Sequence, residues 1–268
     1  DQKTHKIEVG KPIGQFYDYK TLGLYQVEDF DYNAKDQTYT LKEGIPYMSG
    51  TFNRSDIRPG MWKFDDRNGD KVIDDSDMSV IGNANPDFYG GLNNQFKYKG
   101  WDFNFFFTFS YGGEVLNATK LTNTKTATTN YSVLNIANSS NRWMTVNSEG
   151  QLITDPEEMA AINAGRTVAC IYDMEAGDKY IHSWAVEDAS YLRLSNVNLG
   201  YTFDRKKLRN FNIQSLRLYF TGSNLFVWTP YSGFDPEVST KGNNLTPGVD
   251  YGAYPRNRSY VFGLNITF

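Results

Sequence analysis

The sequence predicts an all-β fold, an antiparallel sheet that forms part of the wall of a transmembrane β-barrel. Three observations lead to this prediction. Several segments alternate apolar and polar side chains, one of them has a face made entirely of aromatic residues, and short connections alternate with long ones. Because successive side chains of a strand point to opposite faces, such alternation is typical of a sheet with one apolar surface.

The aromatic face lies in residues 101–111, WDFNFFFTFSY. At a period of two, one side of this strand carries Trp101, Phe103, Phe105, Phe107, Phe109 and Tyr111. A surface in water does not favour such a row. A lipid-facing row with Trp and Tyr at its ends matches the aromatic girdles of outer-membrane barrels. We therefore expect these six rings to face the membrane.

Three further segments alternate in the same way: 190–203, 214–228 and 259–268. The segment 87–98 is also strand-like, and Lys99-Gly100 after it predicts a tight hairpin turn in which glycine adopts a positive φ. In 190–203 the apolar phase changes near Ser195-Asn196, which predicts a β-bulge. We expect about six strands in total, each of a length that can span a membrane.

The connections between the strands differ in length. Lys99-Gly100 and 204–213 are short, whereas the predicted loops 24–86, 112–186 and 229–258 are long. Bacterial barrels have short turns on the periplasmic side and long loops outside the cell, so we expect all three long loops to be extracellular.

Two smaller features are predicted inside the second long loop. Asp155-Pro156 supplies an N-cap and an N1 proline, and Gly165 closes the segment, so we expect a helix over 156–164. The single cysteine, Cys170, excludes an intrachain disulfide, and we expect it to be a small buried residue.

Composition narrows the function classes. The formal net charge of −4 leaves no basic footprint for nucleic acid. No apolar run approaches the ~20 residues of a transmembrane helix, but a spanning strand needs only ~9–11 residues. His5 and His182 are the only histidines, and no zinc spacing, nucleophile motif or phosphate loop is present, so we expect no enzyme. The chain begins at Asp1 without a signal peptide, and we expect it to start inside a longer protein.

Several segments in sequence order resemble one family. They are 7–26, 66–112 (DRNGDKVIDDSDMSVIGNANPDFYGGLNNQFKYKGWDFNFFFTFSYG), 187–203, 215–238 and 248–268. Together they resemble the C-terminal part of SusC/RagA-type TonB-dependent outer-membrane transporters, and the resemblance spans nearly the whole chain.

The resemblance implies a segment of a barrel of ~22 strands around a plug. It also implies the bacterial outer membrane, a SusD-like lipoprotein partner, TonB acting through the plug, and oligosaccharide or peptide cargo. This chain lacks the plug. Because an open sheet edge in lipid leaves backbone groups unpaired, we expect the rest of the barrel and the plug in another segment or chain.

Three functions compete at this point. The first is an importer for oligosaccharides, with the same type of importer for peptides as its variant. The second is a soluble carbohydrate-binding β-sandwich, which explains the alternation but not the aromatic row or a connection as long as 112–186. The third is a passive porin or an adhesion barrel, which would lack an upstream plug.

Residues 66–77, DRNGDKVIDDSD, have the spacing of an EF-hand-type loop. Ca²⁺ (or Mg²⁺) needs several converging oxygens, and this spacing offers them from Asp66, Asn68, Asp70, the Val72 carbonyl, Asp74 and Asp77. Lys71 stands where the turn prefers Gly, and Asp77 is shorter than the usual Glu. The alternative is a turn held by side-chain to backbone hydrogen bonds.

The remaining candidates are aromatic. Sugar rings could stack on loop side chains, for which the candidates are Trp143, Trp184, Tyr231 and Phe234, with Trp228 and Tyr251 in the same class; the alternative is packing within the loops. The last strand ends on Phe268, and with Gly263 and Ile266 it resembles the signal that barrel-assembly machinery recognises, although Val261 stands where a polar residue is usual.

Overall fold

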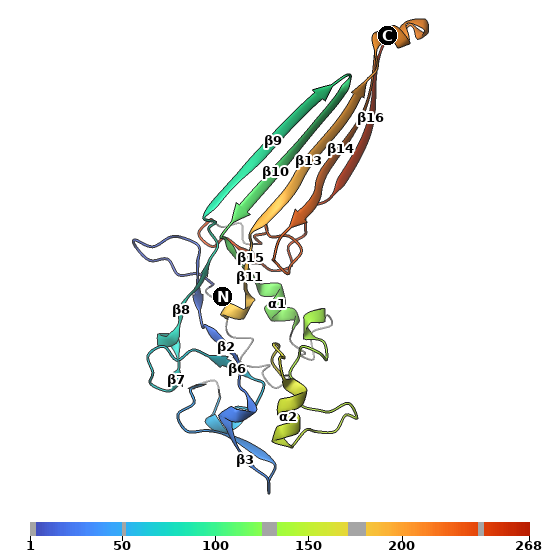
Figure 1. Cartoon of the computed structure of the whole chain (residues 1–268). Coiled ribbons are helices and arrows are strands. Elements are labelled where there is room, and N and C mark those ends of the chain that lie inside the picture. The colour runs from blue at the N-terminus through green and yellow to red at the C-terminus, as the bar shows by residue number, and fades with distance from the viewer. Residues whose placement is uncertain (1–3, 50–51, 125–132, 171–180, 241–243) are drawn as a thin grey trace. The chain divides into compact units, whose positions relative to one another are not determined.

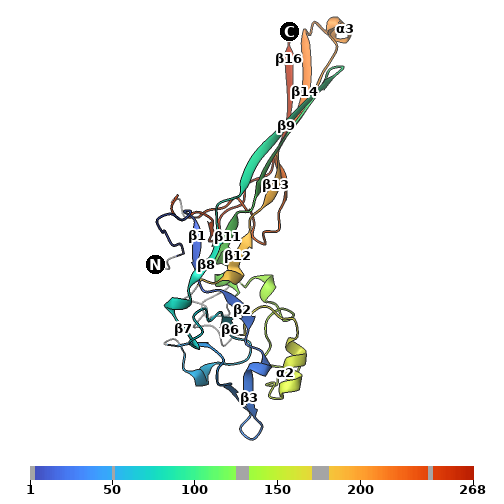
Figure 2. The same ribbon diagram turned by 60° about the vertical axis from the view of Figure 1, so that its left-hand side comes forward.

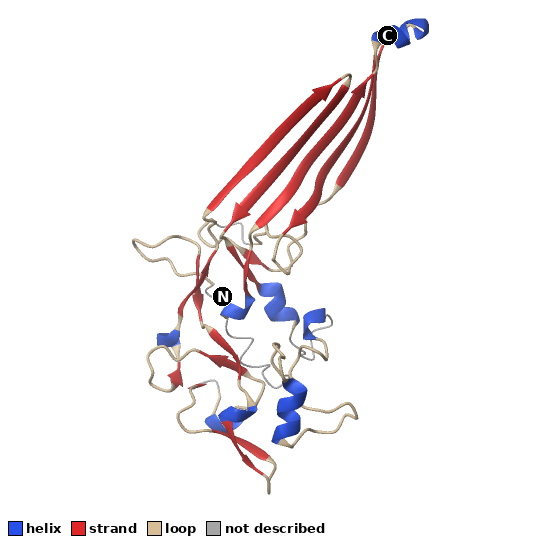
Figure 3. Ribbon diagram, viewed as in Figure 1, coloured by secondary structure: helices blue, strands red, loops and turns tan. Residues whose placement is uncertain are grey.

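The computed structural model describes residues 4–49, 52–124, 133–170, 181–240 and 244–268. The chain divides into two compact units. The strand unit comprises Ala84–Val115, Glu187–Thr240 and Ala253–Phe268, and the loop unit comprises Asp1–Asn83, Leu116–Val186 and Lys241–Gly252. Long strands mark the strand unit in Figure 3, and most of the helices and the short strands belong to the loop unit.

The strand unit is one twisted five-stranded antiparallel sheet (Figures 1 and 2). Its order is β16-β14-β13-β10-β9. The strands are β9 (Phe88–Tyr98), β10 (Trp101–Tyr111), β13 (Tyr191–Thr202), β14 (Ser215–Trp228) and β16 (Ser259–Thr267). Each of the five predicted strand segments is therefore a strand of this sheet. The described residues contain five strands of membrane-spanning length, where about six were expected.

The register confirms the predicted bulge. Pairing of β10 with β13 shifts between Phe106 and Phe107, and pairing of β13 with β14 shifts between Leu194 and Asn196. Ser195 is the residue passed over in both ladders, and its hydroxyl lies 2.7 Å from that of Thr108. The bulge explains why the apolar phase of this strand changes at that point.

The short connections are tight. Tyr98 pairs with Trp101, and the intervening Lys99 and Gly100 both have positive φ, 45° and 88°. The connection 204–213, predicted only as short and basic, forms α3 (Arg205–Leu208), which Asp204 caps, followed by the 3₁₀ turn η7 (Arg209–Phe211). Both connections lie at the same end of the sheet, because Trp101 pairs with Tyr201 and Tyr201 with Leu218.

The loop unit is built from short paired strands. These are β1 (Gln15–Asp18) with β8 (Ser79–Asn83), β2 (Thr21–Leu24) with β6 (Trp62–Phe64), β3 (Phe30–Asn33) with β4 (Thr38–Leu41), and β5 (Tyr47–Met48) in parallel with β7 (Val72–Ile73). In addition, Leu116 and Asn117 of β11 (Glu114–Asn117) pair in parallel with β15 (Val249–Asp250). The chain passes from one unit to the other within β11 and within β12 (Val186–Asp188). Long predicted loops thus contain much local structure.

Helices of the loop unit are short: α1 (Ala118–Asn123), α2 (Pro156–Asn163) and the 3₁₀ turns η1 (Val27–Asp29), η2 (Arg54–Asp56), η3 (Asp75–Asp77), η4 (Asn135–Ala137) and η6 (Ser183–Ala185). The prediction of a helix over 156–164 is confirmed by α2. Its N-cap Asp155 accepts a hydrogen bond from the Glu158 amide, Pro156 occupies the first turn, and Gly165 has a φ of 77°. No helix among the described residues is long and apolar enough to cross a membrane.

The loop unit has its own apolar core. Its buried members include Tyr25, Phe30, Trp143, Met159 and Cys170, so the expected burial of the cysteine is confirmed. Gly60 allows the Trp143 indole to pack against the backbone, because a Cβ on Gly60 would lie 2.3 Å from Trp143 Cγ.

Candidate functional site

The aromatic residues of β10 share one face of the sheet. Register places Trp101 opposite Tyr201, Phe103 opposite Leu199, and Phe109 opposite Leu192. The row extends over the neighbouring strands, where Phe220 of β14 lies opposite Phe262 of β16 with ring centroids 5.0 Å apart. The six predicted membrane-facing residues therefore belong to one apolar surface across five strands. Their contact with lipid stays a prediction.

The opposite face is polar. Asn104 pairs with Asn198, and Asp102 pairs with Gly200 on β13. From the next strand, Arg217 Nη2 reaches within 2.6 Å of Asp102 Oδ2. Phe106 is an apolar residue on this side, and it packs over Gly91 of β9. A sheet with one apolar and one polar face suits a wall between hydrocarbon and a polar interior.

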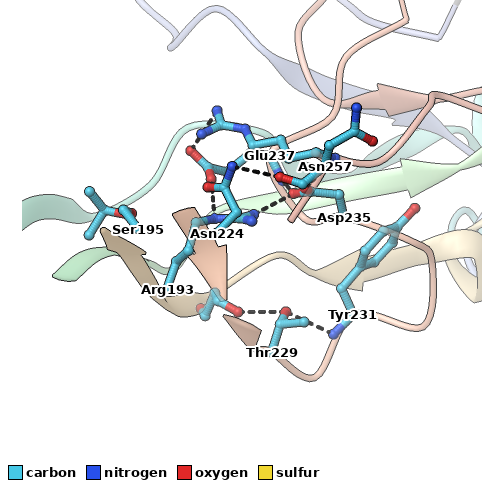
Figure 4. A network of polar contacts seen from close by, with 11 residues as sticks. Arg193, Ser195, Asn224, Thr229, Tyr231, Asp235, Glu237 and Asn257 are labelled. Atoms are coloured by element: carbon cyan, nitrogen blue, oxygen red, sulfur yellow. Dashed lines mark hydrogen bonds and ion pairs between the residues drawn. The ribbon is translucent and has the colours of Figure 1, made fainter. Parts of the chain in front are cut away.

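A buried ion network lies on the polar face near the other end of β13 (Figure 4). Arg193 Nη2 lies 2.6 Å from Asp235 Oδ1, and Arg193 Nε lies 2.7 Å from Glu237 Oε2. Glu237 also contacts Arg256 at 3.1 Å. A buried guanidinium requires such partners, because an unpaired buried charge is costly. The network ties 235–237 and Arg256 to the sheet, and the sequence pattern had given no sign of it because its members are far apart in the chain.

The last strand carries the predicted assembly residues. Ile266 pairs with Leu216, and the exposed Phe268 ends the chain just beyond β16. Gly263 pairs with Tyr219, whose ring lies over it: a Cβ on Gly263 would be 2.0 Å from Tyr219 Cζ. Recognition of these residues by assembly machinery stays a prediction.

Side-chain to backbone hydrogen bonds organise the acidic loop 66–77. Asp66 accepts from the amides of Gly69 and Lys71, at 2.7 and 3.0 Å. Asn68 Oδ1 accepts from the Asp70 amide, and Asp70 Oδ1 accepts from the Val72 amide. Lys71 has a φ of 72° at the position where the motif prefers Gly, so this strained conformation forms here with a non-glycine residue.

Asp77 closes the acidic loop. Its buried carboxylate accepts hydrogen bonds from the amides of Arg67 and Asp74, at 2.8 and 3.0 Å, while Asp74 accepts from the Ser76 amide. These contacts fit the alternative of a hydrogen-bonded turn. In the part of the chain that the structure describes, no three Asp, Glu, His or Cys side chains are grouped closely enough to hold a metal ion. Calcium in this loop stays a prediction.

The four candidate sugar-stacking residues differ in exposure. Trp143 and Tyr231 are 2% and 5% exposed, so their rings offer no open face, whereas Phe234 is 74% exposed. Trp184 is half-buried and lines a pocket of the loop unit together with Trp62. Sequence reasoning missed Trp62, because it lies on a three-residue strand with no alternation to mark it.

No protein-family model matches the sequence. The chain is 34% identical over 272 aligned residues to TonB-dependent receptor P3 of Formosa agariphila, covering 100% of this chain and 23% of that protein. It is 30% identical to TonB-dependent receptor SusC of Bacteroides thetaiotaomicron, covering 76% of this chain and 17% of SusC.

Solved structures show the same fold. The match to a structure of the RagAB peptide transporter covers 99% of this chain and 24% of the transporter chain, with a TM-score of 0.58 and 18% sequence identity. The closed-closed state of the RagAB peptide importer gives a TM-score of 0.59. This likeness confirms the antiparallel barrel-wall fold over the soluble β-sandwich. The chain spans about a quarter or less of the length of the proteins it matches. By its sequence relatives, the chain belongs to the SusC-type TonB-dependent receptors, a family of outer-membrane proteins.

Proposed function

We propose that this chain is part of a TonB-dependent importer that takes up oligosaccharides through the outer membrane together with a SusD-like surface lipoprotein. The relatives named as TonB-dependent receptors support the class of transporter. The observation that carries the proposal is the two-faced sheet, apolar across five strands on one side and polar with an ion pair from β14 to β10 on the other.

The rest of the barrel and the plug complete this importer. Within the described residues, β9 and β16 each pair with only one strand of the five-stranded sheet. An open edge in lipid leaves backbone groups unpaired at a cost of several kcal/mol each. Further strands therefore close the wall, and TonB acts through the plug of the whole importer.

Oligosaccharide is the first candidate cargo and peptide the second. Half-buried indoles in a pocket of the loop unit favour a sugar. The neighbouring fold, RagAB, is a peptide importer, which favours the alternative. Calorimetry on the full-length importer with its lipoprotein, titrated with tetrasaccharides and with tetrapeptides, distinguishes them. Saturable binding of peptides alone would overturn the oligosaccharide.

The membrane placement has a matched test. Phe105→Arg puts a charge on the apolar face, and Asn104→Arg puts the same charge on the polar face one residue away. An arginine facing lipid near the bilayer centre costs about 2–4 kcal/mol. We expect only Phe105→Arg to lower the amount of folded full-length barrel, measured as heat-modifiable protein in isolated outer membranes. Equal effects of the two variants would contradict a lipid-facing aromatic row.

Energised uptake has its own test. Cells with the full-length importer should take up a labelled oligosaccharide that the importer binds, and loss of TonB should abolish this uptake while binding at the surface remains. Uptake that persists without TonB would identify a passive porin, and binding with no uptake in either strain would identify an adhesion barrel.

A further inference from the structure

A pocket of about 720 Å³ opens in the loop unit. It lies beside the paired strands β2 and β6 and the turn η6, and its lining includes Leu22, Asp29, Trp62, Lys63, Arg166 and Trp184. Its volume is within the ~300–1,000 Å³ range of small-molecule sites. All of these residues are in the described part of the chain and in one unit.

Two indoles form the aromatic side of the pocket. The ring centroids of Trp62 and Trp184 are 5.1 Å apart and the rings are tilted by 49°. His182 lies behind them, buried, at 4.7 Å from Trp62 and 6.1 Å from Trp184. Both tryptophans are half-buried and line the pocket, so part of each side chain is open to a ligand.

Several contacts fix these indoles in place. Trp62 pairs with Leu24 in the ladder of β2 and β6. The Trp184 amide donates to Thr21 Oγ1 at 3.2 Å. Lys120 Nζ lies 4.1 Å from the Trp184 ring centroid and donates to the Trp184 carbonyl at 3.0 Å. A platform that is already ordered loses little conformational entropy when a ligand binds.

The charges of the pocket favour a neutral ligand. Lys63 Nζ lies 2.7 Å from Asp29 Oδ1. Arg166 donates to the carbonyl oxygens of Ile162 and Arg142, at 2.8 and 2.7 Å. Both cations that line the pocket are thus already engaged within the protein. A peptide carboxylate or a phosphate would meet a lysine whose charge Asp29 already balances, with the exposed Glu28 also in the lining. Neutral hydroxyl groups can hydrogen-bond to the free edges of this ion pair.

We propose that this pocket binds a neutral pyranose unit of an oligosaccharide, with an apolar sugar face against Trp62 and Trp184 and hydroxyl groups toward Lys63 and Asp29. The proposal rests on the importer function for the identity of its cargo. Aromatic rings present an apolar face beside polar groups, which is the combination that a sugar ring requires.

The test uses the full-length importer in detergent, titrated with four neutral probes: maltotetraose, cellotetraose, xylotetraose and mannotetraose. Trp184→Ala should weaken binding of the recognised tetrasaccharide about tenfold, the loss typical of a truncated aromatic anchor. Leu22→Trp is the second variant. Leu22 is 55% exposed, so the larger side chain fills the pocket without removing packing, and binding should be lost. Tyr32→Ala, an aromatic truncation in the same unit outside the pocket lining, should leave the affinity unchanged.

Uptake of the same tetrasaccharide separates the two proposals. If wild-type cells import it in a TonB-dependent way while Trp184→Ala and Leu22→Trp bind it with unchanged affinity, the pocket assignment is wrong and the importer stands. Tetra-alanine is titrated beside the sugars as the peptide probe. If it alone binds, or if none of the four sugars binds or is imported, the oligosaccharide is wrong in both proposals. A structure of the whole importer with this pocket filled by its own side chains would also overturn the assignment.

Discussion

Arg217 reaches across β13 to Asp102, and the two side chains meet above Gly200. A Cβ on Gly200 would lie 2.5 Å from Arg217 Nη2 and 2.6 Å from Asp102 Oδ1. The glycine therefore provides the space in which strands β10 and β14 are joined by an ion pair over the strand between them.

Gly200→Ala should destabilise the full-length barrel by about 1–3 kcal/mol, the usual cost of overpacking. Urea unfolding in detergent, followed by tryptophan fluorescence, measures the change. In an Arg217→Ser/Asp102→Ser background, where the crowding side chains are shortened, the same alanine should cost clearly less. An equal cost in both backgrounds would show that Gly200 is required for the conformation of the backbone and not for the space that the ion pair occupies.

Gly263→Ala should reduce assembly of the full-length barrel. A Cβ on residue 263 would collide with the Tyr219 ring, which lies over Gly263 of β16. The ring would have to move off this strand to make room. The fraction of heat-modifiable protein in outer membranes measures this effect. Tyr219→Ser should restore assembly of Gly263→Ala. If it does not, Gly263 acts through something other than the space it leaves for this ring, such as recognition during assembly.

Gly60→Ala should destabilise the loop unit far more than Gly44→Ala. The φ values are similar, 86° and 81°, so both alanines bear the left-handed backbone cost of about 1–2 kcal/mol. A Cβ on Gly60 collides with Trp143, whereas one on Gly44 meets nothing within 4 Å. Limited proteolysis of the full-length protein compares the two variants, and equal protease sensitivity would contradict the packing role of Gly60.

Stability of the loop unit should rise as pH falls from 8 to 5. Burial, the largest cause, raises the pKa of the Asp18 carboxyl from 3.8 to about 7, although hydrogen bonds from the Tyr19 and Ile181 amides lower it. Between these two values the folded chain holds a proton that the unfolded chain has released. The stabilisation is complete below the unfolded pKa and is lost as pH rises through about 7, by up to about 1.4 kcal/mol per pH unit.

Asp18→Asn should flatten this pH dependence. The control variant Asp31→Asn changes an exposed carboxylate and should leave the pH dependence unchanged. Rates of limited proteolysis of the full-length protein at pH 5, 6, 7 and 8, corrected for the protease's own pH profile, provide the measurement. A wild-type stability that does not change between pH 5 and 8 would contradict the raised pKa.

Calcium binding to the acidic loop 66–77 is testable with a matched pair. Asp70→Ala removes a predicted ligand, and Asp75→Ala removes a carboxylate from the same loop at a position that the EF-hand spacing does not use. Only Asp70→Ala should lower the calcium content of the full-length protein and the protease resistance of the loop. An unchanged calcium content in Asp70→Ala would show that this loop does not bind calcium through the predicted ligands.

The sequence predicted the five-stranded sheet because stretches with a period of two mark its strands, although the phase in β13 changes at the bulge. It also predicted α2, because an N-cap and an N1 proline stand next to each other at Asp155 and Pro156. Local signals of this kind can be found without knowing which segments meet.

Other parts of the structure depend on contacts between distant residues. The strands of the loop unit are two to five residues long, too short for alternation to mark them. Arg193 lies 42 positions from Asp235, and Thr21 lies 162 positions from Ser183. No spacing rule connects such pairs, so neither the buried ion network nor the pocket beside Trp62 could be predicted from the chain alone.

Ser195 determines the side of the wall on which Arg193 stands. Because the bulge occupies one extra position, Leu192 and Leu194 join the apolar face and the guanidinium points the other way, toward Asp235. Removing that single residue would exchange the faces along the end of the strand and turn a positive charge toward hydrocarbon. Engineered insertions and deletions in this protein must therefore keep the number of residues in β13 constant, even where individual side chains of the strand can be changed.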